Sequence, residues 1–172
     1  TNALKKYSLD SDGYHYTAKE LKSGMLTSKS SRRLGSQNKH IHLYSSYWEE
    51  YYSFGFVRNP WDHFVSLYKW CKKHGNEKTR NGFENFLVNQ FNSNYDSLCD
   101  WDFSCQSDRL FENDIQIVDF VGRFENLEKD FKKICDKLLI KESLPKINSS
   151  KDKTDYRLFY KNDNQIEMIS KM

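Results

Sequence analysis

Residues 53–73 read SFGFVRNPWDHFVSLYKWCKK, and this stretch decides the fold class. Its first part, 53–57, is a short apolar run bounded by polar residues, which predicts a buried strand. Asn59 is a favoured helix N-cap, and Pro60 suits the first position of a helix. Over residues 61–73 the apolar side chains recur at helical spacing. The sequence therefore predicts a strand that leads directly into an amphipathic helix.

The flanking sequence predicts further helices and a second strand. Thr17 and Glu20 form a capping box, which should start a short helix. Residues 117–121 are expected to form the second strand, and Asn126 to cap the helix that follows it. A terminal helix is expected from Gln165. Strands separated by helices indicate an α/β fold with a short parallel sheet flanked by helices.

Length and composition set the broad class of the chain. With 172 residues it fits one domain, expected to span 1–172. The 12 Phe, 11 Tyr and 4 Trp supply a core and exclude a disordered chain. No apolar run is long enough for a membrane span, and no nucleic acid is expected as a partner at a net charge of +3.

The four cysteines are Cys71, Cys99, Cys105 and Cys135. They lack the spacing of a zinc site, so no metal is expected. Two alternatives remain open: four ordinary thiols in or near the core, or a Cys99–Cys105 disulfide in an oxidising compartment.

Arg58 stands where an α/β sheet binds ligands, because it follows a strand and precedes a helix. A guanidinium fork beside the free N–H groups of a helix N-terminus is a natural anion clamp. Ser66 lies two helical turns after Asn59 and faces the same side. Arg58 and Ser66 could therefore grip one phosphate. The alternative is structural: Arg58 pairs with an acid, and Ser66 is a polar filler.

Three blocks of sequence carry a family resemblance. Residues 56–68 resemble the 3′-phosphate-binding motif of sulfotransferases that use 3′-phosphoadenosine 5′-phosphosulfate (PAPS). The closest pattern is that of the carbohydrate-sulfotransferase-like branch, although His63 stands where that branch usually has arginine. Residues 118–131 resemble a second block of the branch, and residues 144–160 a third.

The resemblance implies a P-loop-like α/β fold and transfer of a sulfuryl group from PAPS to a hydroxyl, which in this branch belongs to a carbohydrate, without a metal. It implies that Arg58 and Ser66 bind the 3′-phosphate and that a later loop closes over the nucleotide. The implied residues of that loop and of the segment after it are Ser149, Ser150, Lys151, Lys153, Tyr156 and Arg157.

His15 is the expected general base by the same resemblance, because the branch often carries a histidine just before a short helix. A sugar hydroxyl is a poor nucleophile, and imidazole titrates in a suitable range. The alternative is a surface histidine beside the cap at Thr17.

The chain departs from the family at its start. The family places a P-K-[TS]-[AG]-[GST]-T-[ST] loop after a first strand, where it cradles the 5′-phosphosulfate, and no such motif occurs here. A domain that lacks its first strand and loop, truncated at both ends, is one explanation. The other is a degenerate, catalytically inactive sulfotransferase fold that acts as a nucleotide-binding or interaction module. A lost strand would expose a sheet edge, which favours a homodimer.

A third hypothesis is a binder of single-stranded nucleic acid or glycan, in which aromatic rings stack on bases or sugars. The core spacing of most aromatic residues and the near-balanced charge argue against it. A cytoplasmic location is expected, with the Golgi lumen as the alternative if the chain resembles the membrane-anchored eukaryotic relatives.

Overall fold

The computed structural model describes residues 17–25, 45–92, 105–145 and 152–171. The chain divides into two compact units, and each unit combines two stretches of sequence. The first unit comprises Thr1–Val57 and Gln106–Asn148, and the second comprises Arg58–Cys105 and Ser149–Met172.

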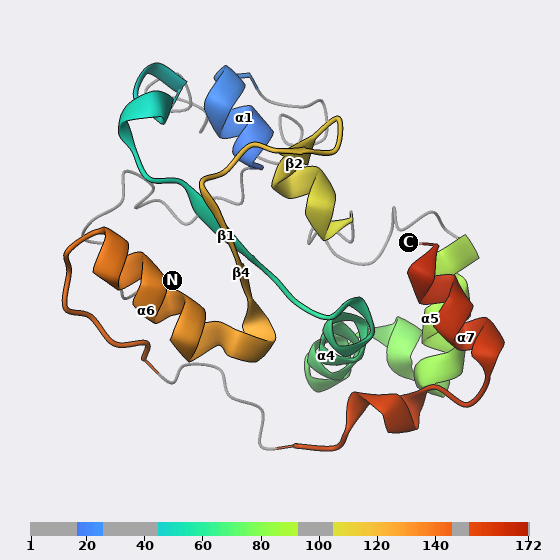
Figure 1. Cartoon of the computed structure of the whole chain (residues 1–172). Helices are drawn as coiled ribbons and strands as arrows, with labels where there is room; N and C mark the ends of the chain where they lie inside the picture. The colour runs from blue at the N-terminus through green and yellow to red at the C-terminus, as the bar shows by residue number, and fades with distance from the viewer. Residues whose placement is uncertain (1–16, 26–44, 93–104, 146–151, 172) are drawn as a thin grey trace. The chain divides into compact units, whose positions relative to one another are not determined.

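A parallel pair of strands forms the centre of the first unit (Figure 1). Strand β1 (Phe54–Val57) pairs with β4 (Phe120–Arg123), with Phe54 opposite Phe120. The backbone N–H and the hydroxyl of Ser53 both donate to the carboxylate of Asp119, at 2.7 and 2.8 Å, and fix the start of the pair. The predicted strand at 53–57 is confirmed, and with it the parallel sheet of the α/β class.

Helix α6 (Leu127–Lys137) follows β4 through the 3-10 turn η6 (Phe124–Asn126) and packs against the strands. Its apolar stripe buries Phe131, Ile134 and Cys135 against aromatic residues of β1 and β4. Asp130 is buried and accepts the backbone N–H of Arg123 at 2.9 Å and Lys133 Nζ at 2.7 Å. These hydrogen bonds lower the pKa of its carboxyl. The end of β4 is thereby fixed to α6.

The second predicted strand is present as β4, but it spans Phe120–Arg123 and not 117–121. Strand β4 begins at Phe120, and the residues before it form a short antiparallel hairpin of β2 (Phe111–Glu112) and β3 (Ile115–Gln116). Asn113 and Asp114, between the two strands, both have positive φ, at 50° and 63°. Such a two-residue turn matches the twist of a hairpin, so the chain reverses here before it enters β4.

Asn126 occupies the N-cap position of α6, as predicted, but its side chain makes no capping hydrogen bond. The 3-10 turn η6 lies directly in front of the helix at this point. Elsewhere the local signals are correct. Helix α1 (Ala18–Ser23) has the full capping box of Thr17 and Glu20, and Lys19 pairs with Glu112 at 2.8 Å.

The second unit is helical, and its core is aromatic. Its main helix is α4 (Pro60–Lys73), joined by the short η4 (Glu77–Thr79) to α5 (Gly82–Asn92). The chain returns as η7 (Tyr156–Phe159) and α7 (Asp163–Ser170), two residues earlier than the predicted start at Gln165. The buried core residues are Phe64, Tyr68, Cys71, Phe86, Leu87 and Ile169.

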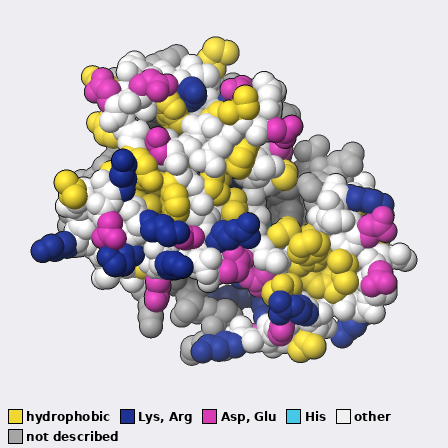
Figure 2. Space-filling model, viewed as in Figure 1, with side chains coloured by type: hydrophobic (Ala, Val, Ile, Leu, Met, Phe, Trp, Pro, Cys, Tyr) yellow, Lys and Arg dark blue, Asp and Glu magenta, His cyan; other side chains and the backbone are white. Residues whose placement is uncertain are grey.

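The space-filling view shows lysine and arginine side chains gathered over α6 (Figure 2). The exposed lysines of this helix alternate with acids, and Lys132 pairs with Asp136 at 2.9 Å across one turn. Exposed pairs of this kind contribute little to stability. We therefore interpret this charged surface as the solvated face of an amphipathic helix.

Candidate functional site

Arg58 is the first residue after β1, and its side chain is 24% exposed. Its Nε donates to the Oδ2 of Asp62 at 2.6 Å, one helical turn further along. The acid partner proposed in the structural alternative is therefore present. This contact uses one of the five N–H groups of a guanidinium, so it does not by itself exclude an anion site.

The N-terminus of α4 begins directly beyond this arginine. The side chain of Asn59 accepts the backbone N–H of Asp62 at 3.2 Å, and Pro60 occupies the first helical position, as predicted. The cap satisfies one of the N–H groups at this helix end, and the helix dipole leaves the end partly positive. An anion is therefore favoured beside Arg58.

Ser66 is half-buried on α4, four residues after Asp62 and three before Lys69. This spacing puts the three side chains on one face of the helix. Within the described part of the chain, the structure records no hydrogen bond for the Ser66 hydroxyl. The hydroxyl can therefore donate to a ligand on this face.

Lys69 fixes the later segment of the chain to the same helix. Its Nζ lies 3.0 Å from Asp152 Oδ2 and 3.4 Å from the carbonyl oxygen of Thr154, and it lies over the ring of Phe159 at 5.1 Å. The hydroxyl and backbone N–H of Thr154 donate to Asp152 at 2.5 and 2.9 Å. These bonds, with Lys69 as a further partner, lower the pKa of Asp152 to about 2.

The next residues pack η7 against the start of α4. The Tyr160 hydroxyl donates to the carbonyl oxygen of Trp61 at 2.9 Å, and Trp61 Nε1 donates to the carbonyl oxygen of Ile166 at 3.1 Å. Burial, with a contribution from the Asp62 carboxylate, raises the pKa of Tyr160 well above its ordinary value. Residues 152–160 therefore run along α4 in the opposite direction to the helix.

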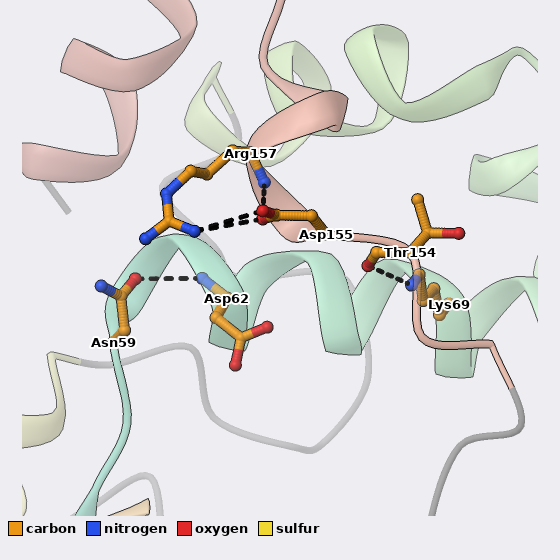
Figure 3. A network of polar contacts seen from close by, with 6 residues as sticks. All are labelled: Asn59, Asp62, Lys69, Thr154, Asp155 and Arg157. Carbon is orange, nitrogen blue, oxygen red and sulfur yellow. Dashed lines mark hydrogen bonds and ion pairs between the residues drawn. The ribbon is translucent and has the colours of Figure 1, made fainter. Parts of the chain in front are cut away.

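Arg157 lies on η7 and points toward the end of α4 that carries Asn59 (Figure 3). Its Nη1 contacts the carboxylate of Asp155 at 3.2 Å, and its guanidinium lies 4.8 Å from the centre of the Tyr156 ring. Asp155 also caps η7 by accepting the backbone N–H of Arg157 at 3.0 Å. Arg157 is exposed, so its pairing with Asp155 is a weak constraint.

The predicted site residues, His15 as the base and the others as cofactor-binding residues, divide into two groups. The described ones all belong to the second unit: Arg58, Ser66, Lys153, Tyr156 and Arg157. The others lie outside the described residues: His15, Ser149, Ser150 and Lys151.

Sequence reasoning missed Lys69, Asp152 and Tyr160 as the residues that join the two segments. The sequence offered one indication that Lys69 belongs to the site, because it lies one turn after Ser66 on the same helical face. It offered no such indication for Asp152 and Tyr160, because their partners are distant in the sequence. The disulfide alternative is untested, because Cys99 lies outside the described residues.

Two parallel strands, each followed by a helix, define an α/β protein. The chain belongs to the sulfotransferase family, which it matches over residues 4–170. It is therefore a transferase of sulfuryl groups, with a hydroxyl acceptor. It is also 38% identical over 104 residues to an uncharacterized protein of Archaeoglobus fulgidus, covering 59% of this chain and 80% of that protein.

No solved structure matches the chain significantly. Among the described residues, none of the helices is long and apolar enough to cross a membrane. The same part of the chain holds no group of three or more His, Cys, Asp or Glu side chains suited to a metal ion.

Proposed function

We propose that the chain transfers the sulfuryl group of PAPS to a carbohydrate hydroxyl, and that Arg58 and Ser66 bind the 3′-phosphate of the donor. The proposed donor site rests on one observation, which is that the candidate residues lie along a single helix. Arg58 precedes the face of α4 that holds Ser66, and the segment with Lys153, Tyr156 and Arg157 is anchored along the same helix.

The chemistry of this donor set fits an anionic nucleotide. Arg58 and Arg157 offer guanidinium N–H groups, Ser66 offers a hydroxyl, and Lys153 adds an exposed ammonium. The helix N-terminus favours a negative group next to Arg58. Asp62 is the acid on this α4 face nearest to Arg58, and its charge is compensated by the ion pair.

When bound, PAPS supplies the sulfuryl group. Arg58 then holds the phosphate by charge and by the geometry of its guanidinium, and Ser66 donates a hydrogen bond to it. Lys153 and Arg157 lower the cost of bringing a multiply charged nucleotide to this surface. Tyr156 offers an aromatic ring in the same segment. Ser149, Ser150 and Lys151 are included in the proposed nucleotide-binding loop on the family resemblance alone.

His15 takes the proton of the attacking hydroxyl in this proposal. A neutral imidazole is required for this step. The assignment rests on the family resemblance and on the position of His15 just before α1. A carbohydrate acceptor is proposed on the same resemblance.

A transfer assay tests the proposal. The chain is incubated with ³⁵S-labelled PAPS and a panel of oligosaccharides, hydroxysteroids and phenols. Label should appear on an oligosaccharide, and Arg58→Ala should reduce transfer at least about tenfold. Arg80→Ala is the matched control, because Arg80 pairs with Glu77 in the same unit and is 72% exposed.

Each other outcome has a distinct meaning. Label on a steroid or phenol alone would contradict the carbohydrate acceptor but not the donor. Nucleotide binding without transfer to any acceptor would favour the inactive nucleotide-binding module. An equal loss in Arg58→Ala and Arg80→Ala would contradict the role of Arg58.

A further inference from the structure

The contact between Arg58 and Asp62 is a short one and is partly shielded from solvent. Nε of Arg58 lies 2.6 Å from Oδ2 of Asp62, and the two side chains are 24% and 28% exposed. A charge-assisted hydrogen bond of this length is strong when water is partly excluded.

Asp62 is itself held in place by the first turn of α4. Its backbone N–H donates to the side chain of Asn59 at 3.2 Å, and Pro60 fixes the turn between them. Tyr160, whose hydroxyl donates to the carbonyl oxygen of Trp61 at 2.9 Å, lies near enough for the Asp62 carboxylate to contribute to its raised pKa. The carboxylate therefore offers Arg58 a fixed acceptor.

We propose that Asp62 is the positioning residue for Arg58: its carboxylate holds Nε, which sets the plane of the guanidinium for bidentate binding of the donor's 3′-phosphate. This inference rests on the proposed function of Arg58. A planar guanidinium bound at Nε rotates less freely about the end of the side chain, so the contact with Asp62 restricts the direction of its two Nη groups. Less conformational entropy is then lost when the phosphate binds.

Two effects of Asp62 on the nucleotide have opposite signs. The carboxylate repels a phosphate, so its removal would strengthen binding if repulsion dominated. It orients Arg58, so its removal weakens binding if orientation dominates. Because the carboxylate already interacts with the guanidinium at 2.6 Å, we expect orientation to dominate.

A double-mutant cycle tests this proposal on the full chain. Affinity for adenosine 3′,5′-bisphosphate is measured by calorimetry for the wild type, Asp62→Asn, Arg58→Ala and the double variant. We expect Asp62→Asn to weaken binding roughly fivefold in the wild-type background and to have no effect beside Arg58→Ala. A purely structural role in α4 would give the same loss in both backgrounds.

The matched control is Asp163→Asn, which removes an exposed acid from the first turn of α7 in the same unit. It reproduces the loss of a helix-dipole interaction without touching Arg58. Nucleotide affinity should not change in this variant. Circular dichroism and thermal melting of every variant show whether the fold is retained.

A second readout needs no nucleotide. The Nε–H of Arg58 should give a slowly exchanging NMR signal in the wild type and a fast-exchanging one in Asp62→Ala. A fast-exchanging signal in the wild type would overturn the proposal, as would unchanged or tighter nucleotide binding by Asp62→Asn. A wild type that shows the protected signal but binds no nucleotide would instead contradict the proposed function. The proposed positioning role of Asp62 would then also be contradicted, because it rests on that function.

Discussion

Nζ of Lys69 lies 3.0 Å from the carboxylate of Asp152 and 3.4 Å from the carbonyl oxygen of Thr154, which is 85 residues further along the chain. Through these two contacts α4, which carries Ser66, is joined to the segment that leads into η7. The side chain of Lys69 is only 22% exposed, whereas that of Asp152 is 52% exposed. The side chain of Lys69 is thus partly covered by the segment that it contacts.

Replacing this lysine should loosen the segment without unfolding the unit. Lys69→Met keeps an unbranched side chain of similar length, while the two polar contacts of the ammonium and its position over the Phe159 ring are lost. We expect faster amide hydrogen exchange over residues 152–160 and a fall in melting temperature of less than about 3 °C. Lys73→Met, an exposed lysine on the same helix, is the control. Unchanged amide exchange over residues 152–160 in Lys69→Met would show that the contacts of Lys69 do not restrain this segment.

The carboxyl of Asp152 should remain ionised far into the acid range. Its pKa in the folded chain is lowered to about 2, first by the hydroxyl and the N–H of Thr154 and then by Lys69. The value in an unfolded chain is about 3.9, so the ionised form contributes stability above that pH. The contribution is lost as the pH falls through about 2. An NMR titration of the carboxyl carbon measures this value.

Thr154→Val is the corresponding variant, because valine keeps the shape and removes the hydroxyl donor. The pKa of Asp152 should then move up toward its ordinary value. A midpoint near 4 in the wild type would mean that Thr154 and Lys69 do not hold the carboxylate in solution.

Gly122 should resist substitution, because a side chain there would collide with the neighbouring strand. A Cβ atom on Gly122 would lie 2.5 Å from the ring of Phe56, its partner in the register of β1 and β4. We expect Gly122→Ala to lower the free energy of unfolding by about 1–3 kcal/mol. Urea denaturation measures it.

Gly55→Ala is the comparison for that experiment. Its Cβ would meet the tip of the Leu110 side chain at 2.4 Å, and this tip can rotate away more easily than a packed aromatic ring. The loss at Gly55 should therefore be smaller. A larger loss at Gly55 than at Gly122 would contradict the observed packing.

Phe86 should be the most costly ring to remove from the second unit. It is 0% exposed, and its ring centre lies 5.5 Å from that of Phe64 and 5.3 Å from that of Tyr68. We expect Phe86→Ala to reduce the free energy of unfolding by about 3–5 kcal/mol. Leu158→Ala, at a side chain that is 64% exposed, should change it by less than about 0.5 kcal/mol. Equal losses in the two variants would show that Phe86 is not part of the core.

Sequence reasoning succeeded where the structure is decided within a few residues. The capping box at Thr17 and the Asn59–Pro60 helix start are local hydrogen-bonding and backbone signals, and both are confirmed. The error in the start of the second strand also has a local cause. Asn113 and Asp114 adopt positive φ angles and form the turn of a hairpin, so the chain reverses before it enters β4. This pair of residues was the signal available in the sequence.

The contacts of the proposed site differ in how far they could be predicted from the sequence. Arg58 and Asp62 are four residues apart at a helix start, so their pairing was within reach of the sequence pattern, whereas the long-range contacts were not. The contacts of Lys69 with Asp152 and of Tyr160 with Trp61 depend on how the chain returns to α4. Neither hydrophobic periodicity nor a helix cap predicts where residues 152–160 pack on α4, because the packing of the whole unit decides it.

The most direct test of the central claim is calorimetric binding of adenosine 3′,5′-bisphosphate, compared with adenosine 5′-phosphate, to the 172-residue chain and to its Arg58→Ala and Ser66→Ala variants. If the two residues bind the 3′-phosphate, the wild type binds the bisphosphate at least about tenfold more tightly, and each variant loses most of this preference. Equal affinity of the folded wild type for the two nucleotides, or a preference that survives in Arg58→Ala, would contradict the claim.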